Sequence, residues 1–231
     1  MKIAVVPALD EEASIAGVVR GALAHVDAVV VVDNGSRDAT ANRAREAGAD
    51  VVDEPRRGYG AACLAGVGRA RQRGATVVLF LDGDGSDDPG EAPLLLGPVE
   101  RNEADLALGV RTRVEPGAMT PVQRFGNWLA PRLMRAAVGA RYRDMPPFKA
   151  VRLDALDRLA LTDTGMGYII EMLLAAHARG LRVVEVEVAC RARRAGASKI
   201  SGTLVGTVRA SAKIVSAIGR HAVLQRLSKN P

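Results

Sequence analysis

The first 81 residues alternate short runs of β-branched and aliphatic residues with alanine-rich stretches of helical length. Strands are expected at residues 2–6, 28–32, 51–53 and 76–81, and helices at residues 12–24, 38–47 and 60–72. A helix between two strands supplies the right-handed crossover that parallel pairing requires. The alternation therefore predicts an α/β fold in which helices flank both faces of a mostly parallel central sheet.

The rest of the chain is less regular. Prolines interrupt residues 112–147, where we expect a helix near 122–137 and a mobile substrate loop. The other expected elements are strands near 105–109, 148–152 and 182–188, a helix at 166–179 and a basic helix at roughly 203–220. Because 231 residues with 48% hydrophobic content can build one full core, we expect a single domain over residues 1–231.

Two aspartates follow the predicted fourth strand at the point where it ends. Asp82 and Asp84 flank Gly83, directly after the apolar run at 76–81. Carboxylates with this spacing can share one divalent cation, and glycine lets a ligand approach the backbone. The pair is suited to holding a diphosphate through Mg²⁺ or Mn²⁺. An isolated Asp-x-Asp is also typical of an acidic turn that caps the next helix.

Three further polar segments, at residues 7–12, 33–38 and 53–60, follow the other early strands. Ligands of such sheets bind beyond the carboxyl ends of the strands, so all four segments are expected to line one crevice. Gly58 belongs to a glycine-rich turn into a helix, whose N–H groups could meet a phosphate or sugar. The acidic residues of the first two segments can also act as helix caps, and both roles can hold together.

Charged residues of the C-terminal half offer two more candidates. Arg193 and Lys199 belong to the basic segment 191–199, which either clamps phosphates or forms a solvated loop. Glu171, in the predicted helix at 166–179, is either a base acting on an acceptor hydroxyl or a surface carboxylate. The residues alone leave these alternatives open.

Other classes of protein are disfavoured. The turn after the first strand is not the glycine-rich turn of a dinucleotide-binding fold, and the chain has no GxxxxGK[ST] loop. The net charge of +6 favours an anionic partner. Nucleic acid is not the expected partner, because aromatic residues make up only 3% of the chain and offer few platforms for stacking bases.

The sequence also bears on location. No apolar leader opens the chain and no apolar run is long enough to span a bilayer, so we expect a cytoplasmic protein. The predicted helix at 203–220 mixes basic and apolar residues. It either lies on an anionic membrane, as a peripheral contact at the inner face, or packs on the domain.

Taken in order, these segments resemble the family 2 glycosyltransferases with the GT-A fold, and more narrowly the dolichol-phosphate mannose synthase group. The resemblance covers about residues 2–202 and is carried by Pro7-Ala8-Leu9-Asp10-Glu11-Glu12, Asp33-Asn34-Gly35-Ser36-Arg37-Asp38-Ala39-Thr40, Gly58-Tyr59-Gly60-Ala61, Asp82-Gly83-Asp84, Gly109-Val110-Arg111 and Arg193-Arg194-Ala195-Gly196-Ala197-Ser198-Lys199. It implies a nucleotide-sugar-binding half at 1–110, an acceptor-side half at 111–202, and a basic helix and tail at 203–231.

The resemblance implies roles for individual residues. Asp82 and Asp84 would hold the metal and the diphosphate, with Gly83 packed against the donor. The residues implied around the nucleoside are Pro7, Leu9, Glu11, Val32, Asp33 and Asn34, and Gly58 completes the donor site. The residues implied to bind phosphates of donor or acceptor are Arg111, Arg193 and Lys199. The predicted catalytic residues are Asp84, Arg111 and Glu171.

The resemblance also implies a reaction. A hexose would pass, with inversion, from a GDP-mannose or UDP-glucose type donor to polyprenyl or dolichyl phosphate. A lipid phosphate needs little base catalysis because its oxygen is already anionic, and the chain lacks the Glu-Asp pair common in the hydroxyl-directed branch. Transfer to a soluble small molecule or glycan hydroxyl is the alternative; a sugar nucleotidyltransferase and a non-catalytic nucleotide-binding protein are more remote. Leu9, Asp10 and Asn34 depart from the family's usual residues, which leaves the base and sugar open.

Overall fold

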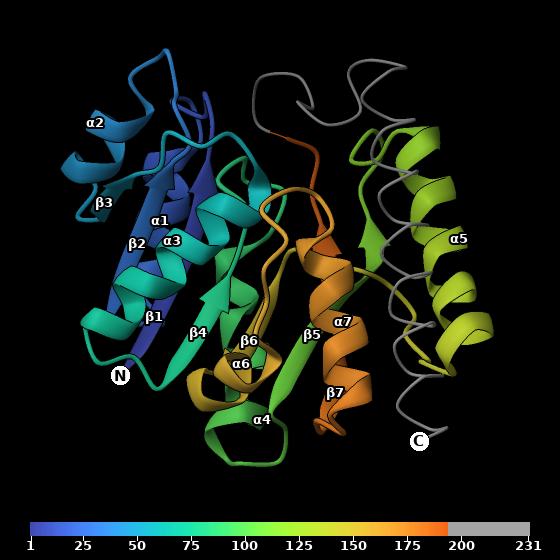
Figure 1. The fold of residues 1–231 in the computed structure, drawn as a ribbon. Helices are drawn as coiled ribbons and strands as arrows, with labels where there is room; N and C mark the ends of the chain where they lie inside the picture. The colour runs from blue at the N-terminus through green and yellow to red at the C-terminus, as the bar shows by residue number, and fades with distance from the viewer. Residues whose placement is uncertain (194–231) are drawn as a thin grey trace.

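The computed structural model describes residues 1–193, and its strands form a seven-stranded sheet in the order β3-β2-β1-β4-β6-β5-β7 (Figure 1). The strands are β1 (Lys2–Ala8), β2 (Ala28–Asp33), β3 (Asp50–Asp53), β4 (Val77–Phe80), β5 (Leu106–Val114), β6 (Lys149–Arg152) and β7 (Val183–Cys190). β6 runs antiparallel to both of its neighbours, β4 and β5, and the other neighbouring pairs are parallel. The prediction of a mostly parallel sheet is confirmed.

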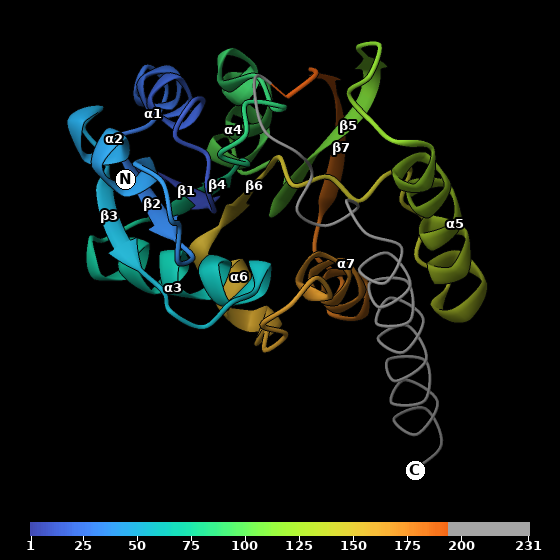
Figure 2. The same cartoon turned by 90° about the horizontal axis from the view of Figure 1, so that it is seen from above.

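Helices cover both faces of this sheet (Figure 2). The α-helices are α1 (Ile15–Leu23), α2 (Thr40–Glu46), α3 (Tyr59–Gln72), α4 (Ala92–Glu100), α5 (Pro121–Val138), α6 (Leu153–Leu159) and α7 (Tyr168–Ala178), and a 3₁₀ turn, η1 (Pro89–Glu91), precedes α4. Apolar side chains of α1, α2 and α4 pack into the core on one face, and those of α3, α6 and α7 pack on the other. β4, and β2 as far as its terminal Asp33, are apolar because both faces of these strands are covered.

Helix α5 lies beyond the β5–β7 edge of the sheet in both views (Figures 1 and 2). It starts with a capping box, in which Thr120 accepts a hydrogen bond from the N–H of Gln123 and Gln123 accepts one from the N–H of Thr120. Pro121 occupies the first turn, where a missing N–H costs nothing, and Gly139 ends the helix with φ of 79°. Pro121, which was expected to break the regular structure of this region, therefore lies at the start of a helix.

Two helices were not predicted. Helix α4 contains Pro93 in its first turn, where proline is tolerated, and Pro98 in its interior, and its Leu95 and Leu96 are buried against the sheet. Helix α6 follows β6 without a turn and is only seven residues long. β5 also runs on to Val114, beyond the expected residue 109, because it pairs with β7 along this extension.

Candidate functional site

A pocket of about 200 Å³ lies beyond the carboxyl ends of β1, β2 and β4. The predicted residues that line it are Pro7, Leu9, Glu11, Asn34, Gly58, Asp82, Gly83, Asp84 and Arg193. They come from all four polar segments and from the chain after β7. The expectation that the four segments share one crevice is confirmed, because parallel strands end at the same edge of a sheet.

Buried carboxylates gather at the floor of this pocket. Asp84 is 3% exposed, and its Oδ1 accepts a hydrogen bond of 2.8 Å from the N–H of Ser86. The Oδ2 of Asp87 accepts one of 3.1 Å from the N–H of Asp82. Burial raises the pKa of Asp82 well above its ordinary value, and the charges of Asp84 and Asp87 raise it further. Burial also raises the pKa of Asp87 to about 6. Because the negative charges of these carboxylates repel one another, a cation that binds among them is stabilised.

Two cationic side chains already face the cluster. The Nη2 of Arg193 lies 2.7 Å from the Oδ2 of Asp84, and its Nη1 lies 3.7 Å from the Oε1 of Glu11. Lys149, at the start of β6, is 0% exposed. Burial lowers the pKa of Lys149, and the charges of Asp82 and Asp87 limit that decrease. Lys149 was not predicted as a site residue; its signal in the sequence is a lysine at the start of a predicted buried strand.

The backbone holds Lys149 in place. Its Nζ donates hydrogen bonds of 2.9 Å to the carbonyl of Pro147 and 3.3 Å to that of Pro146. It also lies 5.1 Å from the ring centre of Phe80, at the end of β4. The buried ammonium group therefore supports the acidic cluster from within the core.

Asn34 joins the loops after β2 and β3 at the rim of the pocket. Its Nδ2 donates hydrogen bonds of 2.9 and 2.8 Å to the carbonyls of Glu54 and Arg56, and its Oδ1 accepts one of 2.8 Å from the N–H of Gly58. These bonds engage both ends of the amide. Asn34 lines the pocket, but its polar atoms hold protein backbone.

The glycine-rich turn packs against another part of the chain. A Cβ on Gly58 would lie 2.2 Å from a backbone oxygen of residues 163–165, and one on Gly60 would lie 2.0 Å from another. The N–H groups of Gly60 and Ala61 donate to carbonyls of the same residues at 3.0 and 2.9 Å. These two N–H groups are therefore engaged within the protein, contrary to the expectation that the turn offers them to a phosphate.

Three predicted residues near the pocket do not line it. Val32 is fully buried in the core, and Asp33 accepts a hydrogen bond of 3.0 Å from the N–H of Ser36, which shapes the loop after β2. Glu171 lies in the first turn of α7. Its carboxylate accepts hydrogen bonds of 3.0 and 2.8 Å from the N–H groups of residues 162 and 163. It therefore orders the loop that contacts the glycine-rich turn.

Arg111 forms a buried ion pair with Asp144. Its Nε and Nη2 donate to the two carboxylate oxygens of Asp144, both at 2.7 Å. Burial opposes ionisation of Asp144, but the hydrogen bonds and charge of Arg111 outweigh it and lower the pKa of that carboxyl. The charge of Arg111 also acts on Asp87. Arg111 thus stands behind the acidic cluster, away from the residues that line the pocket.

The remaining predictions fall elsewhere. Lys199 and the expected helix at 203–220 lie outside the described residues. Within residues 1–193, no helix combines the length and apolar character needed to cross a membrane. In the same range, no group of three or more His, Cys, Asp or Glu side chains is placed to hold a metal ion.

The chemistry of Asp82 and Asp84 nevertheless fits a divalent cation shared with a ligand. Carboxylate oxygens are the donors that Mg²⁺ and Mn²⁺ prefer, and Mg²⁺ sites commonly use one or two carboxylates together with substrate phosphates. In the structure, the guanidinium group of Arg193 pairs with Asp84 and so occupies a position where a metal cation could bind. The two carboxylates at the floor of the pocket therefore favour a bound cation that carries positive charge.

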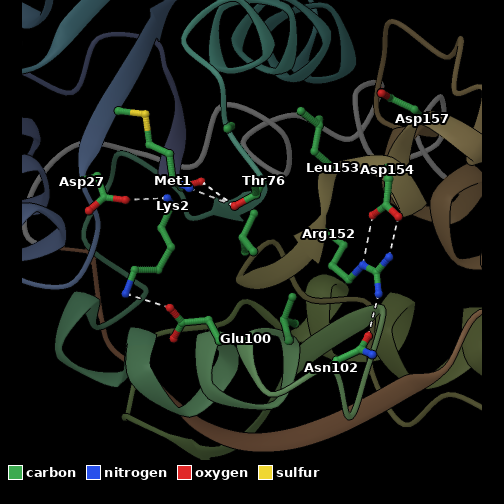
Figure 3. Close-up of a pocket in the computed structure, with 13 residues that line it drawn as sticks. Met1, Lys2, Asp27, Thr76, Glu100, Asn102, Arg152, Leu153, Asp154 and Asp157 are labelled. Carbon is green, nitrogen blue, oxygen red and sulfur yellow. Dashed lines mark hydrogen bonds and ion pairs between the residues drawn. The ribbon is translucent and has the colours of Figure 1, made fainter.

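A larger pocket of about 830 Å³ lies at the opposite ends of the strands, beside the first residues of β1 and β4 (Figure 3). Its charged side chains pair with one another: Lys2 lies 2.9 Å from Glu100, and Arg152 binds Asp154 and Asn102. Hydrogen bonds from Arg152 lower the pKa of Asp154 in this pocket, whereas burial raises the pKa of Asp82 and Asp87. The smaller pocket is therefore the better candidate site.

Known proteins are similar to this chain in sequence and in fold. The model of glycosyl transferase family 2 matches residues 3–159. An uncharacterized glycosyltransferase of Mycobacterium tuberculosis is 40% identical over 205 residues, which cover 88% of this chain and 91% of that protein. The undecaprenyl-phosphate mannosyltransferase of Micrococcus luteus is 33% identical over 191 residues, which cover 77% of each chain.

A solved structure shows the same likeness. Glucosyl-3-phosphoglycerate synthase from Mycobacterium tuberculosis, crystallised with Mn²⁺, uridine diphosphate and glucosyl-3-phosphoglycerate, is similar with a TM-score of 0.76 and 25% identity. The match covers 95% of this chain and 80% of that chain. The fold is thus the GT-A-like α/β fold that the sequence predicts. On the family match and the relatives together, the chain belongs to glycosyl transferase family 2 and is a glycosyltransferase.

Proposed function

We propose that this enzyme transfers a hexose from a nucleotide sugar to a polyprenyl phosphate, with inversion and with the help of a divalent cation. The observation that carries the proposal is the pair of half-buried Asp82 and buried Asp84, which lines the pocket beyond the strand ends beside Arg193. A diphosphate needs positive charge from the protein or from a metal. Arg193 can supply the first, and a cation held by Asp82 and Asp84 can supply the second. The relative crystallised with Mn²⁺ and uridine diphosphate supports the same assignment.

The donor would enter with its diphosphate toward the aspartates. Gly83 packs closely against the chain there, since a Cβ would lie 3.3 Å from the carbonyl oxygen of Pro7 and 3.3 Å from a side-chain carbon of Ile15. Arg193 would exchange its contact with Asp84 for the donor phosphates and keep them oriented. When bound by Asp82 and Asp84, Mg²⁺ or Mn²⁺ would neutralise charge on the departing diphosphate. The charge of Lys149 would stabilise the ionised form of the aspartates that bind the cation.

The proposed acceptor follows from the carboxylates of the site. Glu171, the candidate base, is engaged by the N–H groups of residues 162 and 163. The carboxylates that line the pocket are Glu11, Asp82 and Asp84, and the two aspartates are committed to the cation. A phosphate oxygen is already an anionic nucleophile at neutral pH and needs no base. The mannosyltransferase relative, named for undecaprenyl phosphate, agrees with this choice.

A second acceptor class has its own support. Several similar solved structures are those of glucosyl-3-phosphoglycerate synthase, an enzyme named for a small soluble molecule. Transfer to the hydroxyl of a small phosphorylated molecule is therefore the alternative within the same donor chemistry.

The donor proposal is tested with Asp84→Asn. The amide keeps the size of the side chain and an acceptor for the N–H of Ser86 but loses the charge that holds the cation. We expect metal-dependent stabilisation by GDP-mannose or UDP-glucose in thermal unfolding to disappear, together with transfer. The matched control is Asp53→Asn at the end of β3, where the side chain is 75% exposed. Full transfer by Asp84→Asn would contradict the metal assignment.

The acceptor proposal is tested in a separate assay. Each donor that stabilises the protein is offered with a short polyprenyl phosphate and with 3-phosphoglycerate, and glycosylated product is measured by mass spectrometry. Product on the polyprenyl phosphate supports the proposal. Product only on 3-phosphoglycerate would replace it with the second acceptor class and leave the donor site unchanged.

A further inference from the structure

Helix α5 exposes apolar side chains that the fold does not cover. The chain has one Trp, three Tyr and three Phe, and among the described residues only Phe125 and Trp128 are exposed aromatics, at 60% and 50%. Val122, one turn earlier, is 47% exposed. The three recur at intervals of three residues and so share one side of the helix. An apolar patch gathered in this way marks an interaction surface.

The inner side of α5 is different. The residues of α5 that are buried are Ala130, Pro131 and Met134, all in its second half, and Met134 belongs to the core. The first half has no buried residue. The two exposed aromatic rings stack on each other with their centres 5.8 Å apart, so they form one continuous surface. The helix that carries them, α5, lies beyond the β5–β7 edge of the sheet (Figures 1 and 2).

A basic groove of about 500 Å³ adjoins this surface. Its arginines are Arg132, Arg135, Arg141 and Arg143, and Trp128 forms part of its wall. The guanidinium group of Arg132 lies 4.2 Å from the ring centre of Trp128, which joins the apolar surface to the groove.

Counter-charges of the protein satisfy only part of this groove. Arg143 pairs with Glu187 at 3.1 Å. Arg135 and Arg141 form no ion pair with any described residue. An arginine fork without a protein partner fits phosphate oxygens. The groove is therefore complementary to an anionic phosphate-bearing surface.

We propose that the outer face of α5 and the arginine groove beside it form a docking surface for an anionic lipid bilayer. Phe125 and Trp128 enter the interfacial layer, where aromatic rings are favoured, and the arginines bind lipid phosphates. The proposed function provides only the purpose of this contact, because a polyprenyl phosphate acceptor resides in a membrane. The face differs from the predicted helix at 203–220, which lies outside the described residues.

The chain carries its own reporter for a test. Trp128 is the single tryptophan, so the intrinsic tryptophan emission of the whole chain comes from the proposed surface. The full chain is mixed, without nucleotide or metal, with vesicles of phosphatidylcholine alone or with about a third phosphatidylglycerol. We expect a blue shift, and quenching by brominated acyl chains, only with the anionic vesicles.

Variants separate this face from net charge. Arg135→Gln with Arg141→Gln should weaken vesicle binding roughly 30-fold, because each arginine near an anionic surface contributes about fivefold. Phe125→Ser should weaken it about tenfold. The control pair, Arg20→Gln with Arg158→Gln, removes the same charge from exposed positions on α1 and α6 and should change binding little.

Three results would overturn the proposal: no response to anionic vesicles, an equal loss of binding in the control pair, or Trp128 emission that is already blue and protected from quenchers without vesicles. The last would mean that residues 194–231 or a second copy of the chain covers the face. Because the assay contains no sugar donor, failure here leaves the donor proposal standing. Vesicle binding without any glycosyl transfer would instead count against the proposed function.

Discussion

The contact between Arg193 and Asp84 predicts that the enzyme without nucleotide binds Mn²⁺ more weakly than its carboxylates allow. The Nη2–Oδ2 distance is 2.7 Å, and the two side chains are only 24% and 4% exposed. A charge-assisted hydrogen bond of this kind contributes roughly 1.5–3 kcal/mol. A metal that occupies the carboxylate must displace it. Arg193→Gln should therefore bind Mn²⁺ about 10- to 100-fold more tightly than wild type.

Calorimetric titration of Mn²⁺ in the absence of nucleotide measures this difference. The matched control is Arg191→Gln, which removes a positive charge two residues away, where the side chain pairs with Asp88. Transfer should move in the opposite direction, because the proposed role of Arg193 in the full reaction is to hold phosphates. Unchanged or weaker Mn²⁺ binding by Arg193→Gln would refute the reasoning. An equal gain in Arg191→Gln would show that net charge, and not the direct contact, sets the affinity.

Two further predictions concern the rim and floor of the pocket. Gly60→Ala should lower the free energy of unfolding by about 2–5 kcal/mol, because its Cβ would lie 2.0 Å from a backbone oxygen and disturb two hydrogen bonds. Gly68→Ala, in the same helix with no atom within 4 Å of the new Cβ, should raise it by about 0.5–1 kcal/mol; equal stabilities in urea titrations would contradict the packing described. Because burial raises the pKa of Asp87 to about 6 from an ordinary value of 3.8, the folded protein without metal binds more protons than the unfolded chain between these values. This group's contribution to stability is therefore lost as pH rises through that window, and in EDTA Asp87→Asn should gain up to roughly 3 kcal/mol relative to wild type. Thermal unfolding across that pH range measures the gain, and a relative loss would show that the sign is wrong.

The donor side of the fold could be predicted because its strands are buried on both faces. β2 is a run of valines between an alanine and an aspartate, and such a run has few alternatives to a central parallel strand. Once the strands are parallel, their carboxyl ends must meet at one edge. Asp82, Asp84 and Glu11 were therefore expected together, and the pocket contains all three.

The roles of Lys149 and Asn34 could not be predicted, because each depends on where another part of the chain arrives. The charge of Lys149 acts on Asp82 and Asp87 only because β6 inserts beside β4. The resemblance implies that Asn34 surrounds the nucleoside, yet its amide holds the loops after β2 and β3. A polar residue at a strand end can bind a ligand or hold the rim that surrounds one, and the sequence does not distinguish these outcomes.

The antiparallel strand β6 has a consequence for how the chain is made. It belongs to the proposed acceptor-side half, yet Ala150 pairs with Leu79 of β4 on one side and with Ala107 of β5 on the other. While the chain emerges from the ribosome, the first 110 residues leave an open edge on β4 until β6 arrives to close it. An exchange of acceptor halves between relatives must therefore carry β6 in register with the host β4. The proposed boundary between donor and acceptor halves is therefore not a boundary at which the protein can be cut and rejoined.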